Sequence, residues 1–216
     1  MNRAFIFDVD GTLIDDEAIW EDKKQELYAR LFGESIRAKM GSTLGVNIDG
    51  IYERARKYKT TVSKEAFIKE FYKLADGIYS TAPIPEGTDE LLEYLVEEDF
   101  RIAVVSASPL SWGNTVLQRL KFQDDIELVI SLYDRPDLDH KPHPAGYLEA
   151  MRAMDVVPEN TFILEDSNSG IASAKSSGAY TIGLKQNLVG DYKQEGADIY
   201  AETMANIIHI VKNYLG

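Results

Sequence analysis

The sequence decides its fold class near the N-terminus, in the stretch Ala-Phe-Ile-Phe-Asp-Val-Asp-Gly-Thr-Leu of residues 4–13. Its apolar run, Ala4–Phe7, shows no polar alternation, which is typical of a buried strand in a parallel sheet. The run ends in two carboxylates, Asp8 and Asp10, and Gly11 permits a sharp backbone turn directly afterwards. Ligands bind beyond the carboxyl ends of such strands, so this stretch predicts a functional site there.

Further apolar runs suit buried strands, and helical patterns separate them. The runs are Ile102–Val105, Glu127–Ile130, Thr161–Leu164 and Tyr180–Leu184. Apolar residues recur at helical spacing in the segments that follow Gly87, Ser111 and Pro144. Strands that alternate with helices predict an α/β fold with a doubly wound (Rossmann-like) parallel sheet.

The alternation is interrupted in residues 15–82, where the pattern is helical throughout. A long apolar stripe begins behind Ser63, which stands where a helix N-cap is expected. Two prolines at the end of the stretch force extended backbone and suit a hinge. We therefore expect an all-helical cap, residues 15–82, inserted into an α/β catalytic core of residues 1–14 and 83–216.

Composition and charge exclude several classes of protein. Apolar residues make up 44 % of the 216 residues, which is enough for a packed core. Acidic residues outnumber basic ones by 36 to 23, and the net charge of −13 argues against a nucleic-acid partner. The sequence has no cysteine, so thiol chemistry is excluded. Charges interrupt every apolar stretch, so we expect no membrane partner and a cytoplasmic protein.

Polar side chains follow other predicted strands as well. After the second strand come Ser106 and Ala107, where a hydroxyl and backbone N–H groups can hold phosphate oxygens. Lys141 offers a point charge for a phosphoryl group and for a nucleophile. The fourth strand ends in Glu165 and Asp166. These residues predict a site for a phosphorylated ligand at one edge of the sheet.

The acidic residues at these strand ends also predict a metal site. Asp8, Asp10, Glu165 and Asp166 would crowd their carboxyl groups into one crevice, and a divalent cation relieves the resulting repulsion. Oxygen ligands suit Mg²⁺ better than zinc or copper. Asp8 and Asp10 are one residue apart at a strand end, so one of them can attack as a nucleophile while the other handles a proton. An Asp-x-Asp pair alone is usually a solvated turn, but four groups in this order are hard to explain by coincidence.

These motifs resemble those of the haloacid dehalogenase-like superfamily, and the resemblance spans nearly the whole chain. The stretch from Asp8 to Leu13 resembles its first motif, Ser106 its second, Lys141 its third and Glu165-Asp166 its fourth. The resemblance implies that Asp8 forms an aspartyl-phosphate. It implies that Asp10 protonates the leaving oxygen and then deprotonates the attacking water. It also implies a Mg²⁺ bound by Asp8, the Asp10 backbone carbonyl and Asp166, with Glu165 close by or acting through water.

Within the superfamily, the chain is most similar to the β-phosphoglucomutase-like group, especially its hexose- and hexitol-phosphate phosphatases. Residues 13–20, which include Glu17 and Trp20, resemble the signature Leu-Ile-Asp-Ser-Glu-Pro-Leu-Trp of these enzymes. Thr43 and Gly45 belong to a segment that resembles a cap loop facing the active site in them. The resemblance implies a phosphatase acting on a small phosphorylated metabolite, a sugar or sugar-alcohol phosphate. We expect a monomer or a weak dimer.

Departures from the family pattern leave alternatives open. Mutases of this group carry a histidine where this chain has Trp20, which counts against β-phosphoglucomutase-type phosphoryl transfer. Related phosphatases often carry an arginine after the cap-loop glycine, where this chain has Val46 and Asn47, and Arg54 or Arg56 are candidates to replace it. A phospho-receiver signalling domain is an alternative of another class, because it combines acidic groups, a hydroxyl, a lysine and Mg²⁺ on a doubly wound sheet. Such a domain is much shorter and lacks a helical insert.

Overall fold

The protein was analysed as a computed structural model that describes residues 2–43 and 46–216. The chain divides into two compact units. The first, the core, comprises Met1–Glu17 and Ala82–Gly216, and the second, the cap, comprises Ala18–Thr81. The sequence predicted a cap of residues 15–82. The cap in the structure begins three residues later and ends one residue earlier.

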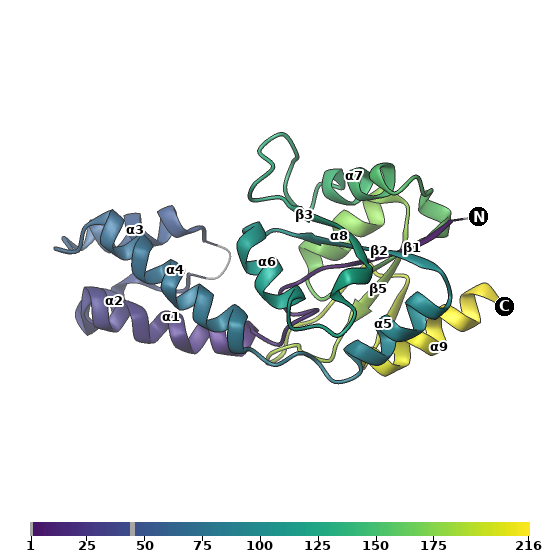
Figure 1. The fold of residues 1–216 in the computed structure, drawn as a ribbon. Coiled ribbons are helices and arrows are strands. Elements are labelled where there is room, and N and C mark those ends of the chain that lie inside the picture. Colours follow the sequence, from purple (N-terminus) through teal and green to yellow (C-terminus); the bar gives the residue numbers. More distant parts are fainter. Residues whose placement is uncertain (1, 44–45) are drawn as a thin grey trace. The chain divides into compact units, whose positions relative to one another are not determined.

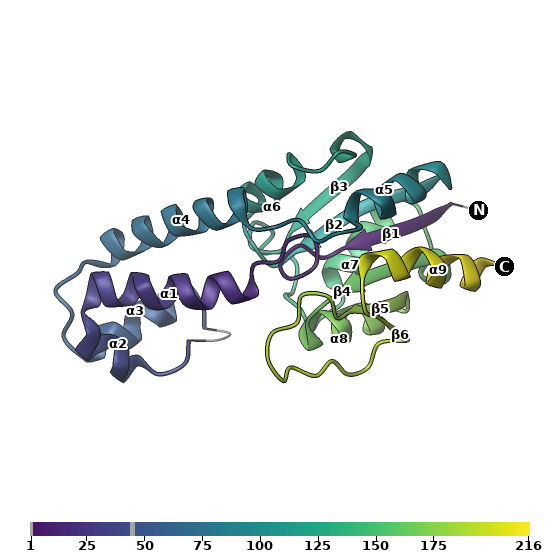
Figure 2. The same ribbon diagram turned by 90° about the horizontal axis from the view of Figure 1, so that it is seen from below.

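The core contains a six-stranded parallel sheet, which confirms the predicted α/β doubly wound fold. Its strands are β1 (Arg3–Phe7), β2 (Phe100–Ser106), β3 (Ile126–Ser131), β4 (Thr161–Glu165), β5 (Tyr180–Leu184) and β6 (Ile199–Ala201). They lie in the order β3-β2-β1-β4-β5-β6, which can be followed across Figure 2. The first five match the predicted runs to within two residues at each end, whereas β6 was not predicted.

Strand β1 occupies the middle of the sheet and aligns the ends of its neighbours. Its residue Phe7 lies opposite Val104 of β2 and Leu164 of β4. Four of its five residues are buried, as its apolar run predicts. Since the three strands are parallel and in register, the residues that follow them emerge at the same edge of the sheet. This edge carries the candidate site.

Helices cover both faces of the sheet, as right-handed crossovers require. They are α5 (Thr88–Glu97), α6 (Leu110–Leu117), α7 (Ala145–Ala153), α8 (Asn168–Ser177) and α9 (Met204–Leu215), with 3₁₀ turns at Gln123–Asp125 and Pro158–Asn160. Figure 1 shows α7 and α8 on one face and α5 with α9 on the other. On the α7 and α8 face, Ile6, Ala103, Tyr147 and Met151 belong to one buried cluster. This packing fixes the strand ends that carry the acidic residues.

The cap is helical, and Phe67 lies at the centre of its core. Its helices are α1 (Glu17–Phe32), α2 (Glu34–Met40), α3 (Ile48–Lys57) and α4 (Lys64–Thr81). Phe67 is fully buried, with the rings of Tyr28, Phe32, Tyr52 and Phe71 at centroid distances of 5.2–6.5 Å. The Ser63 hydroxyl accepts the Ala66 N–H at 3.2 Å, which confirms the predicted N-cap. Within 18–43 and 46–81 the structure contains no strand.

Helix α4 is the longest helix of the cap, with 18 residues. It is amphipathic: its buried residues form a stripe, and its lysines and acids all lie outside that stripe. Over residues 2–43 and 46–216, none of the helices combines the length and apolar character needed to cross a bilayer.

Candidate active site

Lys141 connects the ends of β1 and β4 at the carboxyl edge of the sheet. Its Nζ lies 2.5 Å from Asp8 Oδ1 and 2.7 Å from Glu165 Oε1. It also donates to the Val105 carbonyl at 3.1 Å, so all three ammonium hydrogens have acceptors. Only 7 % of the lysine side chain is exposed. The structure thus brings Lys141 together with one carboxylate that is 133 residues away in the sequence and another that is 24 residues away.

Three carboxylates crowd around this lysine. Asp8, Glu165 and Asp166 each offer an oxygen within 4.8 Å of the others, and all three side chains are buried. Burial raises the pKa of Asp8 well above its usual value, against the opposing effect of Lys141. Burial, followed by the charge of Asp8, likewise raises the pKa of Asp166. One ammonium does not compensate three carboxylates, so the site favours a further cation.

Mg²⁺ fits this set of donors. The groups are all carboxylate oxygens, which hard divalent cations prefer, and the described cluster has no nitrogen or sulfur ligand. Burial would lower the pKa of Lys141, but Asp8 and Glu165 more than offset this and raise the pKa well above its usual value. The lysine therefore stays charged beside the acids and cannot act as a base.

Glu165 is held more firmly than the other acids. Besides Lys141, its Oε1 accepts the Tyr147 hydroxyl at 2.5 Å, and its Oε2 accepts the Ser167 hydroxyl at 3.2 Å. Gly170, in the first turn of α8, leaves room for this carboxylate, because a Cβ there would lie 1.9 Å from its atoms. The fully buried Glu165 carboxylate is therefore fixed on both oxygens.

Asp10 lies beside two hydroxyls from the loop after β2. Its Oδ2 accepts the Ser106 hydroxyl at 3.2 Å and the Ser108 hydroxyl at 2.9 Å. Ser106 Oγ also accepts the Ser108 N–H at 2.9 Å, so the loop is internally braced. Ala107 is exposed between the two serines. Asp10, the expected proton-transfer group, therefore contacts the loop of Ser106 and Ala107, which was expected to bind phosphate.

Gly11 turns the chain sharply after Asp10, as the sequence predicts. Its φ is +74°, and a Cβ would lie 2.1 Å from Asp166 Oδ2, so only glycine fits here. The Gly11 N–H donates to Asp16 Oδ1 at 2.9 Å. Asp16 is 1 % exposed, and burial, followed by the charge of Asp10, raises its pKa to about 8. A buried carboxyl with a raised pKa therefore supports the turn.

The residues expected to meet substrate from the cap occupy different environments. Glu17 is exposed at the start of α1 and belongs to the core unit rather than to the cap. Trp20 is half-buried and packs on Phe71 with a ring-centroid distance of 5.5 Å. Thr43 is 3 % exposed and lies 3.4 Å from the Tyr28 hydroxyl, inside the cap. Gly45 lies outside the described residues.

The two arginines considered as replacement cations have partners within the cap. Arg54 donates to the backbone carbonyls of Met40 and Ser42. Arg56 forms an ion pair with Glu53 at 2.6 Å. Both guanidinium groups thus have a role in the cap itself.

Sequence reasoning assigned no role to several side chains that support the site. Tyr147 was placed in a helical pattern, and its contact with Glu165 had no signal because the two residues come from separate elements. The acidic stretch 134–139 also had no assigned role. In the structure Asp134 accepts the Leu110 N–H at 2.7 Å and the Ser131 hydroxyl at 2.9 Å. It therefore fixes the start of α6 against the end of β3.

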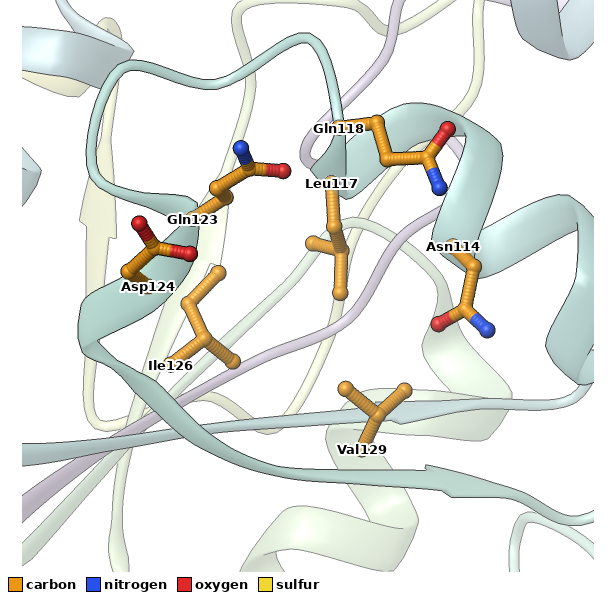
Figure 3. A pocket seen from close by; sticks show the side chains of 7 residues that line it. All are labelled: Asn114, Leu117, Gln118, Gln123, Asp124, Ile126 and Val129. Atoms are coloured by element: carbon orange, nitrogen blue, oxygen red, sulfur yellow. The ribbon is translucent and has the colours of Figure 1, made fainter.

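A hollow of about 200 Å³ elsewhere in the core is a poor candidate for the same function. It is lined by Asn114, Leu117, Gln118, Gln123, Asp124, Ile126 and Val129 (Figure 3). Its described lining includes one acid and no basic residue. It offers nothing that attracts a phosphate, and it shares no residue with the acidic cluster.

Comparison with protein families decides the identity. The model of the haloacid dehalogenase-like hydrolase family matches residues 5–184. The chain is a haloacid dehalogenase-like hydrolase. This matched range contains Asp8, Asp10, Lys141 and Asp166, and the resemblance inferred from the motifs is confirmed.

Phosphatases are among the relatives of this haloacid dehalogenase-like hydrolase. Hexitol phosphatase B of Escherichia coli K12 is 30 % identical over 178 residues, covering 81 % of this chain and 79 % of the relative. The phosphorylated carbohydrates phosphatase of Thermotoga maritima is 26 % identical over 181 residues, covering 82 % of each chain. The protein is accordingly an enzyme, a phosphoric monoester hydrolase.

Solved structures show the same fold. A Thermotoga maritima protein, provisionally assigned as a beta-phosphoglucomutase, has a TM-score of 0.77 at 24 % identity, with 99 % of each chain covered. CbbY of Rhodobacter sphaeroides, solved with phosphate, has a TM-score of 0.73 at 20 % identity, with 96 % of each chain covered. At these identities the likeness supports the fold of the haloacid dehalogenase-like hydrolase.

Proposed function

We propose that the enzyme is a Mg²⁺-dependent phosphatase that forms an aspartyl-phosphate on Asp8. The observation that carries the proposal is the 2.5 Å contact between Lys141 Nζ and Asp8 Oδ1 within a buried acidic cluster. Burial raises the pKa of Asp8, and the neighbouring ammonium opposes this rise and so favours the ionised carboxylate, which is the nucleophilic form. The same ammonium can balance charge on phosphoryl oxygens once a substrate binds.

The proposed reaction has two displacement steps at phosphorus. An Asp8 oxygen attacks phosphorus, the bond to the ester oxygen breaks, and Asp10 gives its proton to that departing oxygen. Asp10 then takes a proton from a water that attacks the phosphorus of the aspartyl-phosphate, which releases inorganic phosphate and restores Asp8. The Ser106 and Ser108 hydroxyls, 3.2 and 2.9 Å from Asp10 Oδ2, orient this acid and base.

The acidic cluster supports the proposed metal requirement. The carboxylates of Asp8 and Asp166, with the backbone carbonyl of Asp10, would hold a Mg²⁺. The bound ion would supply positive charge to neutralise the transferring phosphoryl group. Glu165 already accepts hydrogen bonds from Lys141 and Tyr147, so we propose that it lies close to the metal or acts on it through water.

The proposed substrates are sugar and sugar-alcohol phosphates. The support comes from the relatives, which include a hexitol phosphatase and a phosphorylated carbohydrates phosphatase. A panel of phosphate monoesters assayed with Mg²⁺ tests the proposal. We expect the highest kcat/KM among hexose, hexitol and related polyol phosphates. A preference for nucleotides or phosphoglycolate would overturn this substrate class, and conversion of glucose 1-phosphate to the 6-phosphate would show mutase activity instead.

Replacing the nucleophile tests the proposed chemistry. Asp8→Asn removes the attacking charge, so we expect kcat to fall by about a thousandfold or more. Asp124→Asn is the matched control, because it makes the same change in the hollow of Figure 3 and should leave kcat unchanged. Steady-state turnover of an aryl phosphate measures both variants. Robust turnover by a folded Asp8→Asn variant would refute the assignment of Asp8.

A further inference from the structure

The segment between β5 and β6, residues 185–198, contacts both acid-bearing turns of the site. It directly follows residues 5–184, to which the family model extends. Two amide side chains from this segment reach backbone carbonyls of those turns. Asn187 Nδ2 donates to the Gly11 carbonyl at 2.9 Å, and Gln194 Nε2 donates to the Asp166 carbonyl at 2.6 Å.

The Asn187 contact fixes the turn that follows Asp10. Asn187 is 8 % exposed, and its amide can only donate to a carbonyl, so the direction of the hydrogen bond is unambiguous. The Gly11 N–H is held from the other side by Asp16 Oδ1 at 2.9 Å. Both backbone polar groups of Gly11 are therefore held by buried side chains. A shift of this turn would move Asp10 relative to its serine partners.

The Gln194 contact fixes the turn that carries Asp166. Its Nε2 also donates to the Leu184 carbonyl at 2.7 Å, so both amide hydrogens have acceptors on the ends of neighbouring strands. Asn168, at the start of α8, holds the chain on either side of Gln194. Its Nδ2 donates to the Lys193 carbonyl at 2.8 Å, and its Oδ1 accepts the Glu195 N–H at 2.8 Å.

We propose that Asn187 and Gln194 are positioning residues for phosphoryl transfer, each fixing the backbone of one acid-bearing turn. The inference rests on the proposed roles of Asp10 and Asp166. Neither amide is placed on a reacting atom. Both act by keeping the carboxylates at fixed distances from one another. The reaction rate depends steeply on these distances, because a displacement of about 1 Å can lower the rate on the order of 100-fold.

The segment provides a matched control in Gln186, next to Asn187. Its Nε2 donates to the Glu86 carbonyl at 3.2 Å, and its Oε1 accepts the Met204 N–H at 2.7 Å. Gln186→Ala therefore removes two hydrogen bonds of the same kind from the same segment, but neither lies in an acid-bearing turn. A purely structural role for Asn187 and Gln194 predicts that all three variants behave alike.

The test compares kcat, KM and melting temperature for Asn187→Ala, Gln194→Ala and Gln186→Ala, with an aryl phosphate and saturating Mg²⁺. We expect Asn187→Ala and Gln194→Ala to lower kcat by about tenfold to a hundredfold, with KM changed by less than about threefold. Gln186→Ala should lower the melting temperature while kcat stays at the wild-type value. If the kcat values of all three folded variants agree, the proposal is overturned.

Asn187→Asp is the second variant, for the case in which Asn187→Ala does not fold. It keeps the side-chain shape but replaces the donor that faces the Gly11 carbonyl, so it should show the same loss of kcat. A wild-type kcat in folded Asn187→Asp overturns the role of Asn187. Asp8→Asn, assayed in parallel, separates the two proposals. If Asp8→Asn is active, the proposed function is refuted. If Asp8→Asn is inactive but the Asn187 variants are fully active, only the present inference is refuted.

Discussion

Among single side chains, Lys141 has the most demanding position, because its one ammonium group pairs with two buried carboxylates and also donates to the Val105 carbonyl. Its ammonium lies 2.5 Å from Asp8 and 2.7 Å from Glu165, both nearly or fully inaccessible to water. In such surroundings an unpaired charge is costly, so the lysine and the acids depend on one another. The proposed anionic substrate would therefore meet a buried cation even though the chain has a net charge of −13.

Asp16 leads to a prediction about the pH dependence of stability. Its pKa is raised by burial to about 8, whereas the unfolded chain has the ordinary value of 3.8. Between these values the folded state binds a proton that the unfolded state has lost, so the free energy of unfolding falls as pH rises. In Asp16→Asn this contribution is absent. Between pH 5 and 7 we expect the free energy of unfolding to fall with rising pH in the wild type by up to about 1.4 kcal/mol per pH unit more than in the variant.

Denaturant unfolding of both proteins at several pH values measures this difference. The Asn side chain still offers an oxygen to the Gly11 N–H, so the variant should fold. Parallel stability curves for the two proteins would contradict the raised pKa.

The sequence predicted the acidic residues better than the side chains that support them. Asp8, Ser106 and Glu165 could be grouped in advance because the carboxyl ends of parallel strands meet at one edge. Asn187 gave no such signal, because its partner Gly11 is 176 residues away and only the folded backbone brings the two together. Tyr147 likewise looked like an ordinary core residue of a helix.

Helix α8 begins against Glu165, and this packing leads to a second prediction. Gly170→Ala would place a Cβ 1.9 Å from the Glu165 carboxylate, so the carboxylate or the helix must move. We expect a lower melting temperature and a loss of kcat of about tenfold or more, since Glu165 holds Lys141.

Gly77→Ala in α4 is the control for this change, because nothing lies within 4 Å of the added Cβ. There the substitution should stabilise the helix by about 0.5–1 kcal/mol and leave kcat unchanged. If the Gly170→Ala variant had the wild-type kcat and melting temperature, this would contradict the close packing of Gly170 against the Glu165 carboxylate.

The strands and helices followed their sequence patterns where those patterns were long enough. Four of the five predicted strands are almost entirely buried, whereas β3 at the edge of the sheet is only partly buried. Helix α4 has a long apolar stripe behind Ser63. Strand β6, Ile199–Ala201, has only three residues and was missed. So short a strand has no measurable periodicity, and it forms because β5 offers an open edge.

For the chain as a whole, metal binding should appear as a gain in stability. A Mg²⁺ concentration of 100 times the dissociation constant stabilises the folded state by about 2.7 kcal/mol, or a rise in melting temperature of roughly 5–10 °C. Asp166→Asn removes a proposed ligand and should abolish most of this rise. Excess EDTA should stop turnover, and added Mg²⁺ should restore it. Full activity in EDTA, or the same thermal shift in Asp166→Asn, would contradict the Mg²⁺ assignment.

The division of the chain into a core and a helical cap was also expected from the sequence, because strands disappear from the pattern between residues 15 and 82. The substrate is harder to predict. Specificity within a shared fold depends on a few side chains, and both candidate arginines, Arg54 and Arg56, are engaged within the cap. The oligomeric state stays a prediction.

The most direct test of the account is to identify the residue that carries the phosphoryl group. The enzyme is mixed with substrate and Mg²⁺, quenched rapidly in acid, digested and analysed by peptide mass spectrometry. We predict a phosphorylated peptide with the modification on Asp8, absent in Asp8→Asn. A phosphoryl group on another residue, such as Ser106, would contradict the account.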